Sequence, residues 1–225
     1  NIDGEDSITE TCLTKITSLI LTPPWPELIG NALNYTSKVI RGFAHEGMYH
    51  VLDYESTLEL LDVEGKFARF EKQKKIKYVQ DNIIAHQDYA WGDGKILVNY
   101  KCHPGKAVDR YRSGYKTYIL IALHEVKNRG DVDDFHITWE TKDGFLTPDG
   151  FWETNISQKT TQMRVNVIFP KKRLPKRVIV EESNHRKTHI ITSEERTVLP
   201  DGRMKVSWLK NKPRLFETYL MKWLW

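Results

Sequence analysis

The clearest regularity in the sequence is an alternation of apolar and polar residues with a period of two. It runs through Tyr115–Lys127 and Val132–Thr141, which the polar segment Asn128–Asp131 separates. A period of two is typical of strands that bury one face, and the separating segment has the composition of a turn. The two segments are therefore predicted to pair as a long hairpin, in which Leu120 faces Trp139.

The same alternation recurs along most of the chain after Gly47. Turn residues separate the predicted strands, as at Asp62–Gly65, where glycine stands at the last turn position, and His103–Arg112 is predicted to be a connecting loop. The other strands are expected at Tyr49–Leu61, Lys66–Gln80, Ile83–Trp91, Ile96–Cys102, Phe151–Asn155, Thr161–Phe169, Arg177–Glu182, His189–Thr192, Arg203–Lys210 and Leu215–Trp225. About ten short strands with local connections predict an antiparallel β-sandwich, of jelly-roll or immunoglobulin-like arrangement.

The first 47 residues have a different pattern. Ser7–Glu10 has the spacing of a capping box, and the apolar residues that follow it recur at helical intervals. Prolines end this helix, and a second helix is predicted over Pro26–Arg41. We therefore expect a helical pair over residues 1–47, acting as a cap or connector, and a β-sandwich domain over residues 48–225. The stretch from about residue 160 is an alternative, smaller immunoglobulin-like half.

The composition is that of a globular chain rather than a disordered one. Of the 225 residues, 40% are hydrophobic and 28% are charged, a balance that allows a buried core. The net charge of +4 is small for a dedicated nucleic-acid binder, and the sequence predicts no membrane-spanning segment. Cys12 and Cys102 are far apart, which favours a reducing cytoplasm. The glycosylation triplets at Asn34 and Asn155 keep an extracellular location as an alternative.

The histidines and carboxylates of the predicted hairpin are candidates for a metal site. His124, Glu125 and His136 are close in sequence, but the predicted register puts His124 on one face and the other two on the opposite face. The sequence also has no nucleophile motif and no phosphate-binding glycine loop. We therefore expect no metal, no cofactor and no catalytic residues.

One turn has the chemistry of a ligand site. Trp91 precedes the turn that contains Asp93, and a tryptophan ring is a stacking platform for a sugar or another small ligand. His86 and Asp88 share one face of the preceding strand and could flank a site made with Asp93. The alternative interpretation is a polar strand face exposed to solvent.

Two basic clusters have the composition of polyanion sites. The first, Lys72–Lys77, spreads its charge over both faces of a strand, as in an edge strand protected from aggregation. The second lies in a turn bounded by prolines and consists of Lys171, Lys172, Arg173, Lys176 and Arg177. Phosphate contacts need only such a basic patch.

Three functions follow from these features. The first is a non-catalytic β-sandwich interaction or assembly module that binds a protein partner or self-associates. Because the chain begins with asparagine, we expect it to be part of a larger multidomain or multi-subunit system. The second is a small-ligand or carbohydrate sensor that uses the loop at Trp91. The third is polyanion or nucleic-acid binding through the basic clusters.

Overall fold

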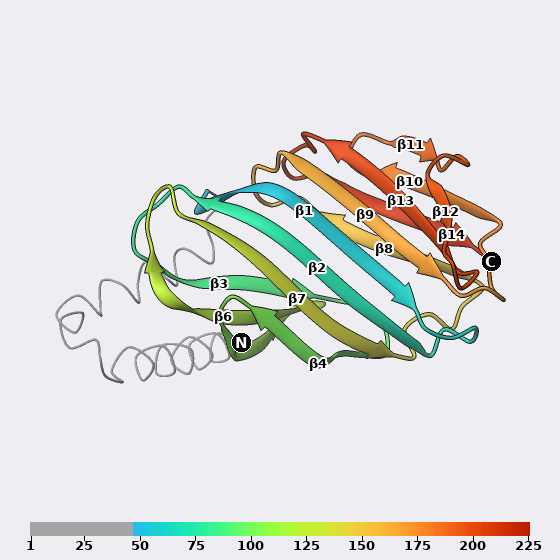
Figure 1. Ribbon diagram of the computed structural model, residues 1–225, viewed down its shortest axis with the longest axis horizontal. Coiled ribbons are helices and arrows are strands. Elements are labelled where there is room, and N and C mark those ends of the chain that lie inside the picture. The colour runs from blue at the N-terminus through green and yellow to red at the C-terminus, as the bar shows by residue number, and fades with distance from the viewer. Residues whose placement is uncertain (1–46) are drawn as a thin grey trace. The chain divides into compact units, whose positions relative to one another are not determined.

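The computed structural model describes residues 47–225, so the helices predicted before Gly47 lie outside the described residues. Within 47–225 the chain is built from strands and contains no helix, which confirms the mainly β class (Figure 1). The strands are β1 (Tyr49–Leu60), β2 (Phe67–Tyr78), β3 (Ile83–Ala90), β4 (Lys95–His103), β5 (Lys106–Ser113), β6 (Lys116–Lys127), β7 (Val132–Lys142), β8 (Asp149–Asn155), β9 (Gln162–Phe169), β10 (Arg177–Glu182), β11 (Lys187–Ile190), β12 (Arg196–Val198), β13 (Met204–Asn211) and β14 (Thr218–Leu224).

The described residues form two compact units, whereas the sequence predicts one domain over 48–225. The small unit contains residues 78–91 and 104–131, and thus β3, β5 and β6. The large unit contains residues 49–77, 92–103 and 132–225. The strands after residue 160 lie in the same two sheets of the large unit as β1, β2 and β8.

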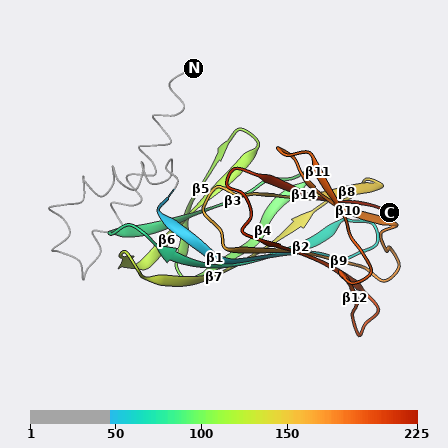
Figure 2. The ribbon, with the colours of Figure 1, turned by 90° about the horizontal axis from the view of Figure 1, so that it is seen from above.

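The large unit is a β-sandwich, as the sequence predicts. A seven-stranded sheet in the order β12-β13-β9-β1-β2-β7-β4 faces a four-stranded sheet in the order β11-β10-β14-β8, and Figure 2 shows β2 and β9 in one layer with β10 and β14 in the other. Aromatic rings meet between the layers: Phe70 lies 4.9 Å from Trp152, and Phe169 lies 5.5 Å from Trp223. These contacts bury large apolar areas, the main source of stability in such a fold.

The predicted alternation is clearest in the strands that line this core. In β9 the side chains of Met163, Val165, Val167 and Phe169 are buried, while Arg164 is exposed. The last strand, β14, has apolar residues on both parities and is predicted to be central or covered. It lies between β10 and β8, which confirms that prediction.

Most strand pairs are antiparallel, as expected from local hairpins, but β1 and β9 pair in parallel. Leu58 of β1 lies opposite Val167 of β9. More than a hundred residues separate the two strands in sequence, and no short turn can join parallel neighbours. A pattern read from local turns therefore could not predict this pair.

The long hairpin predicted over Tyr115–Thr141 is wrong. In the small unit β6 lies between β3 and β5, whereas β7 pairs with β2 and β4 in the large unit. Leu120 accordingly lies opposite Gln87, and Trp139 lies opposite Phe70. The turn after β6 has the expected chemistry, but the two strands that it joins enter different sheets.

Two further sequence-based assignments also need correction. The predicted loop at His103–Arg112 contains strand β5, an edge strand whose polar side chains remain in water while its backbone pairs with β6. Strand β2 is not an edge strand, because it lies between β1 and β7. Its inward-facing Lys72 places the ammonium group 4.7 Å above the ring of Trp139, which lets a cation face the core.

Candidate functional site

Two residues of the site predicted around Trp91 are buried in the small unit. His86 and Asp88 share one face of β3, as predicted, but each is only 2% exposed. The alternative prediction, that these residues lie on a strand face exposed to solvent, is therefore wrong. Tyr89 and Trp91 follow the other parity of the strand, and Asp93 belongs to the large unit. His86 and Asp88 thus do not share the face of β3 that carries Tyr89.

The structure instead gives Trp91 aromatic neighbours from the small unit. The ring of Tyr89 stacks on Trp91 with centroids 5.5 Å apart, and Tyr115 meets Trp91 edge-on at 6.3 Å. Across the sheet, Tyr118 lies 5.9 Å from Tyr89 and 5.3 Å from Tyr111. We call these five residues the aromatic cluster.

A lysine lies within this cluster. The ammonium group of Lys116 is 5.0 Å from the ring centroids of both Tyr89 and Trp91, and 5.4 Å from that of Tyr115. The sequence does signal the alternation of Tyr89 and Trp91 along one strand. It does not signal which residues of β5 and β6 lie beside them, because this depends on the register of three strands.

A second candidate surface is formed by three loops of the large unit. It consists of five large apolar side chains that are between 41% and 55% exposed, and we call it the loop patch: Leu61, Val63, Phe67, Leu146 and Leu174. The β1–β2 and β7–β8 loops are joined by a hydrogen bond from the Phe145 N–H to the Gly65 carbonyl, 3.1 Å long. Exposed apolar side chains on loops that are joined to one another are candidates for an interaction site.

Arg173 fastens the third loop to the other two. Its guanidinium group donates to the carbonyl oxygens of Val63 at 3.0 Å and Thr147 at 3.1 Å, and it stacks 4.0 Å from the ring of Trp225. Burial lowers the pKa of Arg173, although the Asp62 charge acts in the opposite direction. Arg173 therefore orders the loop patch rather than offering its charge to a ligand.

Asp62 orders the β1–β2 turn beneath the loop patch. Burial alone would raise the pKa of its carboxyl group, but hydrogen bonds from the backbone N–H groups of Lys66, Phe67, Glu64 and Gly65 outweigh burial and lower it. The carboxylate accepts from the N–H of Lys66 at 3.0 Å and of Phe67 at 2.6 Å. An ionised Asp62 thus holds the turn in one conformation.

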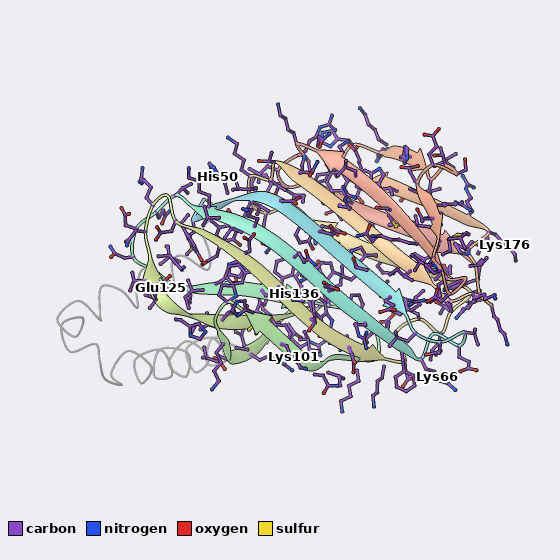
Figure 3. All side chains as sticks on the ribbon, viewed as in Figure 1. His50, Lys66, Lys101, Glu125, His136 and Lys176 are labelled. Atoms are coloured by element: carbon purple, nitrogen blue, oxygen red, sulfur yellow. The ribbon has the colours of Figure 1, made fainter. Side chains whose placement is uncertain are left out.

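The other members of the second basic cluster lie at the rim of the loop patch. Lys171, Lys172, Lys176 and Arg177 are exposed on the segment that Arg173 anchors. Figure 3 shows Lys176 and Lys66 projecting from the same end of the large unit. The predicted basic cluster is therefore a structural arginine together with a rim of solvated cations.

The large unit also contains three histidine–carboxylate pairs, one between the paired strands β2 and β7 and two at loops. His136 lies 2.9 Å from Glu71, His189 lies 2.7 Å from Glu195, and His185 hydrogen-bonds Glu217. Among residues 47–225, no three His, Cys, Asp or Glu side chains converge as a metal site would require. The described residues contain no helix that could span a membrane.

Glu217 provides a pH-dependent prediction. Burial alone would raise its pKa, but hydrogen bonds from the Asn184 N–H, from His185 and from the Thr218 N–H lower it. A lowered folded pKa stabilises the fold above the unfolded pKa of 4.5, and this contribution is lost as the pH falls through the folded value. We expect Glu217→Gln to cost about 2 kcal/mol at pH 7 and progressively less below pH of about 4.

Urea unfolding of both proteins between neutral and acidic pH checks this expectation. Glu64→Gln is the matched control, since the side chain of Glu64 is exposed. A difference between wild type and Glu217→Gln that stays constant over the whole pH range would contradict the assignment.

Comparison with known proteins gives the fold no family name. No protein-family model and no curated protein matches the sequence. Among solved structures, the chain is similar to an M1 zinc metallopeptidase from Deinococcus radiodurans, with 10% identity and a TM-score of 0.42 over 78% of this chain and 42% of that one. A two-domain M1 zinc metallopeptidase mutant bound to L-tryptophan gives 10% identity, a TM-score of 0.43 and the same coverage. This chain thus spans less than half the length of either protein.

Proposed function

We propose that this chain is a non-catalytic interaction module that docks a protein partner on the loop patch. The observation that carries the proposal is the set of five exposed apolar side chains on three loops, and at the start of β2, that hydrogen bonds join. Loops at one end of a β-sandwich are a common place for binding residues, because the sheets hold them in position. Arg173 adds rigidity, since it ties the β9–β10 turn to the carbonyl oxygens of Val63 and Thr147.

The charge around the loop patch indicates what the partner looks like. Lys171, Lys172 and Lys176 are exposed beside it, so an apolar partner surface with an acidic rim would be complementary. Rim charges act mainly on the association rate and on specificity, whereas the apolar centre supplies most of the affinity. The proposed compartment is the cytoplasm, which the wide spacing of the two cysteines supports.

The hydrogen bonds between histidines and carboxylates support a non-catalytic role. A general acid or base needs access to a substrate, whereas Glu217 is buried and binds two backbone N–H groups as well as His185. Glu195 likewise binds His189 and the Thr192 N–H within one loop. These pairs stabilise turns. We further propose that the module is one part of a larger system whose other parts carry any chemistry.

Site-specific photo-crosslinking in cells tests the docking surface. A photoreactive amino acid at Leu146 is expected to give a discrete crosslinked product, because Leu146 lies within the loop patch. The matched position is Val198, which is also exposed but lies on β12. Leu174→Asp should abolish the product from position 146 while the far-ultraviolet circular dichroism stays unchanged.

The outcomes separate protein docking from polyanion binding. Equal crosslinking from positions 146 and 198 would contradict the proposal. A product that contains nucleic acid, disappears in Lys171→Glu/Lys172→Glu and survives Leu174→Asp would assign the surface to a polyanion instead. In that case binding should also weaken steeply between about 50 and 200 mM salt.

A further inference from the structure

We propose that the aromatic cluster of the small unit binds a small zwitterionic quaternary ammonium compound of the betaine type. The ammonium group of the ligand would lie between the rings of Tyr89, Trp91 and Tyr115. Its anionic group would pair with the ammonium group of Lys116, which moves out of the cage. This site is separate from the loop patch and does not depend on the proposed protein docking.

The first support is that these rings already hold a cation. The Lys116 ammonium group lies 5.0, 5.0 and 5.4 Å from the centroids of Tyr89, Trp91 and Tyr115, all within the range of a cation–π contact. Tyr89 and Trp91 are inclined to each other by 20°, and Tyr115 stands at 88° to Trp91. The three rings therefore form walls in two orientations around one position.

The second support is that the wall formed by Tyr89 is held in place without the lysine. Tyr118 packs against Tyr89, and Tyr111 stacks on Tyr118 with an interplanar angle of 13°. The hydroxyl of Tyr111 accepts a 2.7 Å hydrogen bond from Gln87. This continuous row across β3, β6 and β5 orients the cage in advance, which reduces the ordering cost of binding.

A quaternary ammonium group fits this environment better than a lysine does. The lysine ammonium is compact and strongly hydrated, with three N–H donors that aromatic faces satisfy poorly. A quaternary ammonium has no N–H group, and its methyl groups contact the rings directly. Tyr115 is 63% exposed, so the cage is open to solvent, and the flexible stem of Lys116 allows it to leave without a change in the backbone.

Lys116 also explains why a zwitterion is expected rather than a simple cation. Once displaced, its positive charge remains close to the cage and repels a ligand that carries only positive charge. A carboxylate attached to the quaternary ammonium turns this repulsion into an ion pair. The lysine thus selects for a ligand with both charges a few bonds apart.

The experiment measures the binding of glycine betaine and tetramethylammonium to the full chain by tryptophan fluorescence and titration calorimetry. Wild type is expected to bind glycine betaine more tightly than tetramethylammonium. Lys116→Met should bind tetramethylammonium about fivefold more tightly than wild type and lose the preference for betaine, since one exposed cation–π contact is worth about that factor. Tyr115→Ala should weaken betaine binding by about fivefold or more, and its exposed position makes it safe for the fold.

Phe151→Ala is the matched control, because Phe151 is also an exposed aromatic side chain but lies on β8, outside the aromatic cluster. It should bind betaine as wild type does. Absence of binding in both wild type and Lys116→Met would overturn the proposal, as would betaine affinity that Tyr115→Ala leaves unchanged. Binding to phosphatidylcholine vesicles without binding of free betaine would assign the cage to a lipid surface and would also overturn it.

Discussion

Replacing Trp139 by alanine is expected to lower the free energy of unfolding by about 4 kcal/mol. Trp139 is only 3% exposed, and its ring stacks on Phe70 at 4.9 Å with an interplanar angle of 10°. Tyr100 approaches at 6.4 Å, and the ammonium group of Lys72 lies over the ring. Alanine would remove these contacts and leave a cavity. It would also deprive the buried Lys72 of its aromatic partner.

Urea unfolding monitored by circular dichroism measures this effect. Phe151→Ala is the control, because Phe151 is 53% exposed on β8 and its truncation should change the unfolding free energy by less than about 0.5 kcal/mol. Equal losses in the two variants would show that Trp139 is not part of the core of the large unit.

Gly65→Ala is expected to cost about 3 kcal/mol and to disorder the loop patch. Gly65 has φ of +77°, and a Cβ there would overlap the carbonyl oxygen of Phe145. An alanine in this left-handed conformation is strained by about 1 kcal/mol. The overlap adds a further cost, since the obstacle is backbone and cannot rotate away. Because Gly65 accepts the hydrogen bond from Phe145, the β1–β2 and β7–β8 loops would move apart.

Gly114→Ala separates the two costs. Gly114 has φ of +58°, and nothing lies within 4 Å of a Cβ built there. This variant should lose only about 1 kcal/mol, which is the backbone strain alone. Gly65→Ala should in addition abolish crosslinking from position 146. If both variants lose the same stability, the close approach of Phe145 has no energetic consequence.

Periodicity was sufficient to predict the strands that line the sandwich core. In β2 the buried side chains follow one parity, so the pattern along the chain reports burial directly. In β9 the apolar parity is buried as well, but Asn166 on the polar parity is also buried and hydrogen-bonds Glu55, Thr57 and Ser207. The sequence also predicts the bounds of β10 and the central place of β14. Strand β5 was missed because an edge strand can keep polar side chains in water on both parities, while its backbone hydrogen bonds alone secure it.

Strand pairing could be predicted only where a local turn decides it. The turn at Asp62–Gly65 does join two neighbouring strands, β1 and β2. The turn at Asn128–Asp131 looks equally suitable, yet β6 and β7 take other partners. A turn fixes where the chain reverses, but the energy of a sheet comes from side chains opposite one another. Those of β6 find better partners in β3 and β5.

At the two candidate sites, too, the sequence predicts the residue types but not which distant residues meet. The sequence identified Trp91 as an aromatic surface and the segment Lys171–Arg177 as basic. It could not show that Lys116 and Tyr115 lie beside Trp91, or that Arg173 is occupied by the carbonyl groups of two other loops. Each of these relations joins residues that are distant in sequence.

The sequence by itself determined that this protein is built mainly of strands, which side chains of most strands face the core, and where the chain turns. These properties depend on neighbours one to four residues away. The tertiary structure alone decided which strands share a sheet, that β1 and β9 run in parallel, and which loops and rings meet at the loop patch and the aromatic cluster. The physical reason is that burial energy depends on the whole arrangement of faces, so residues far apart in the chain acquire their roles only when the sheets pack.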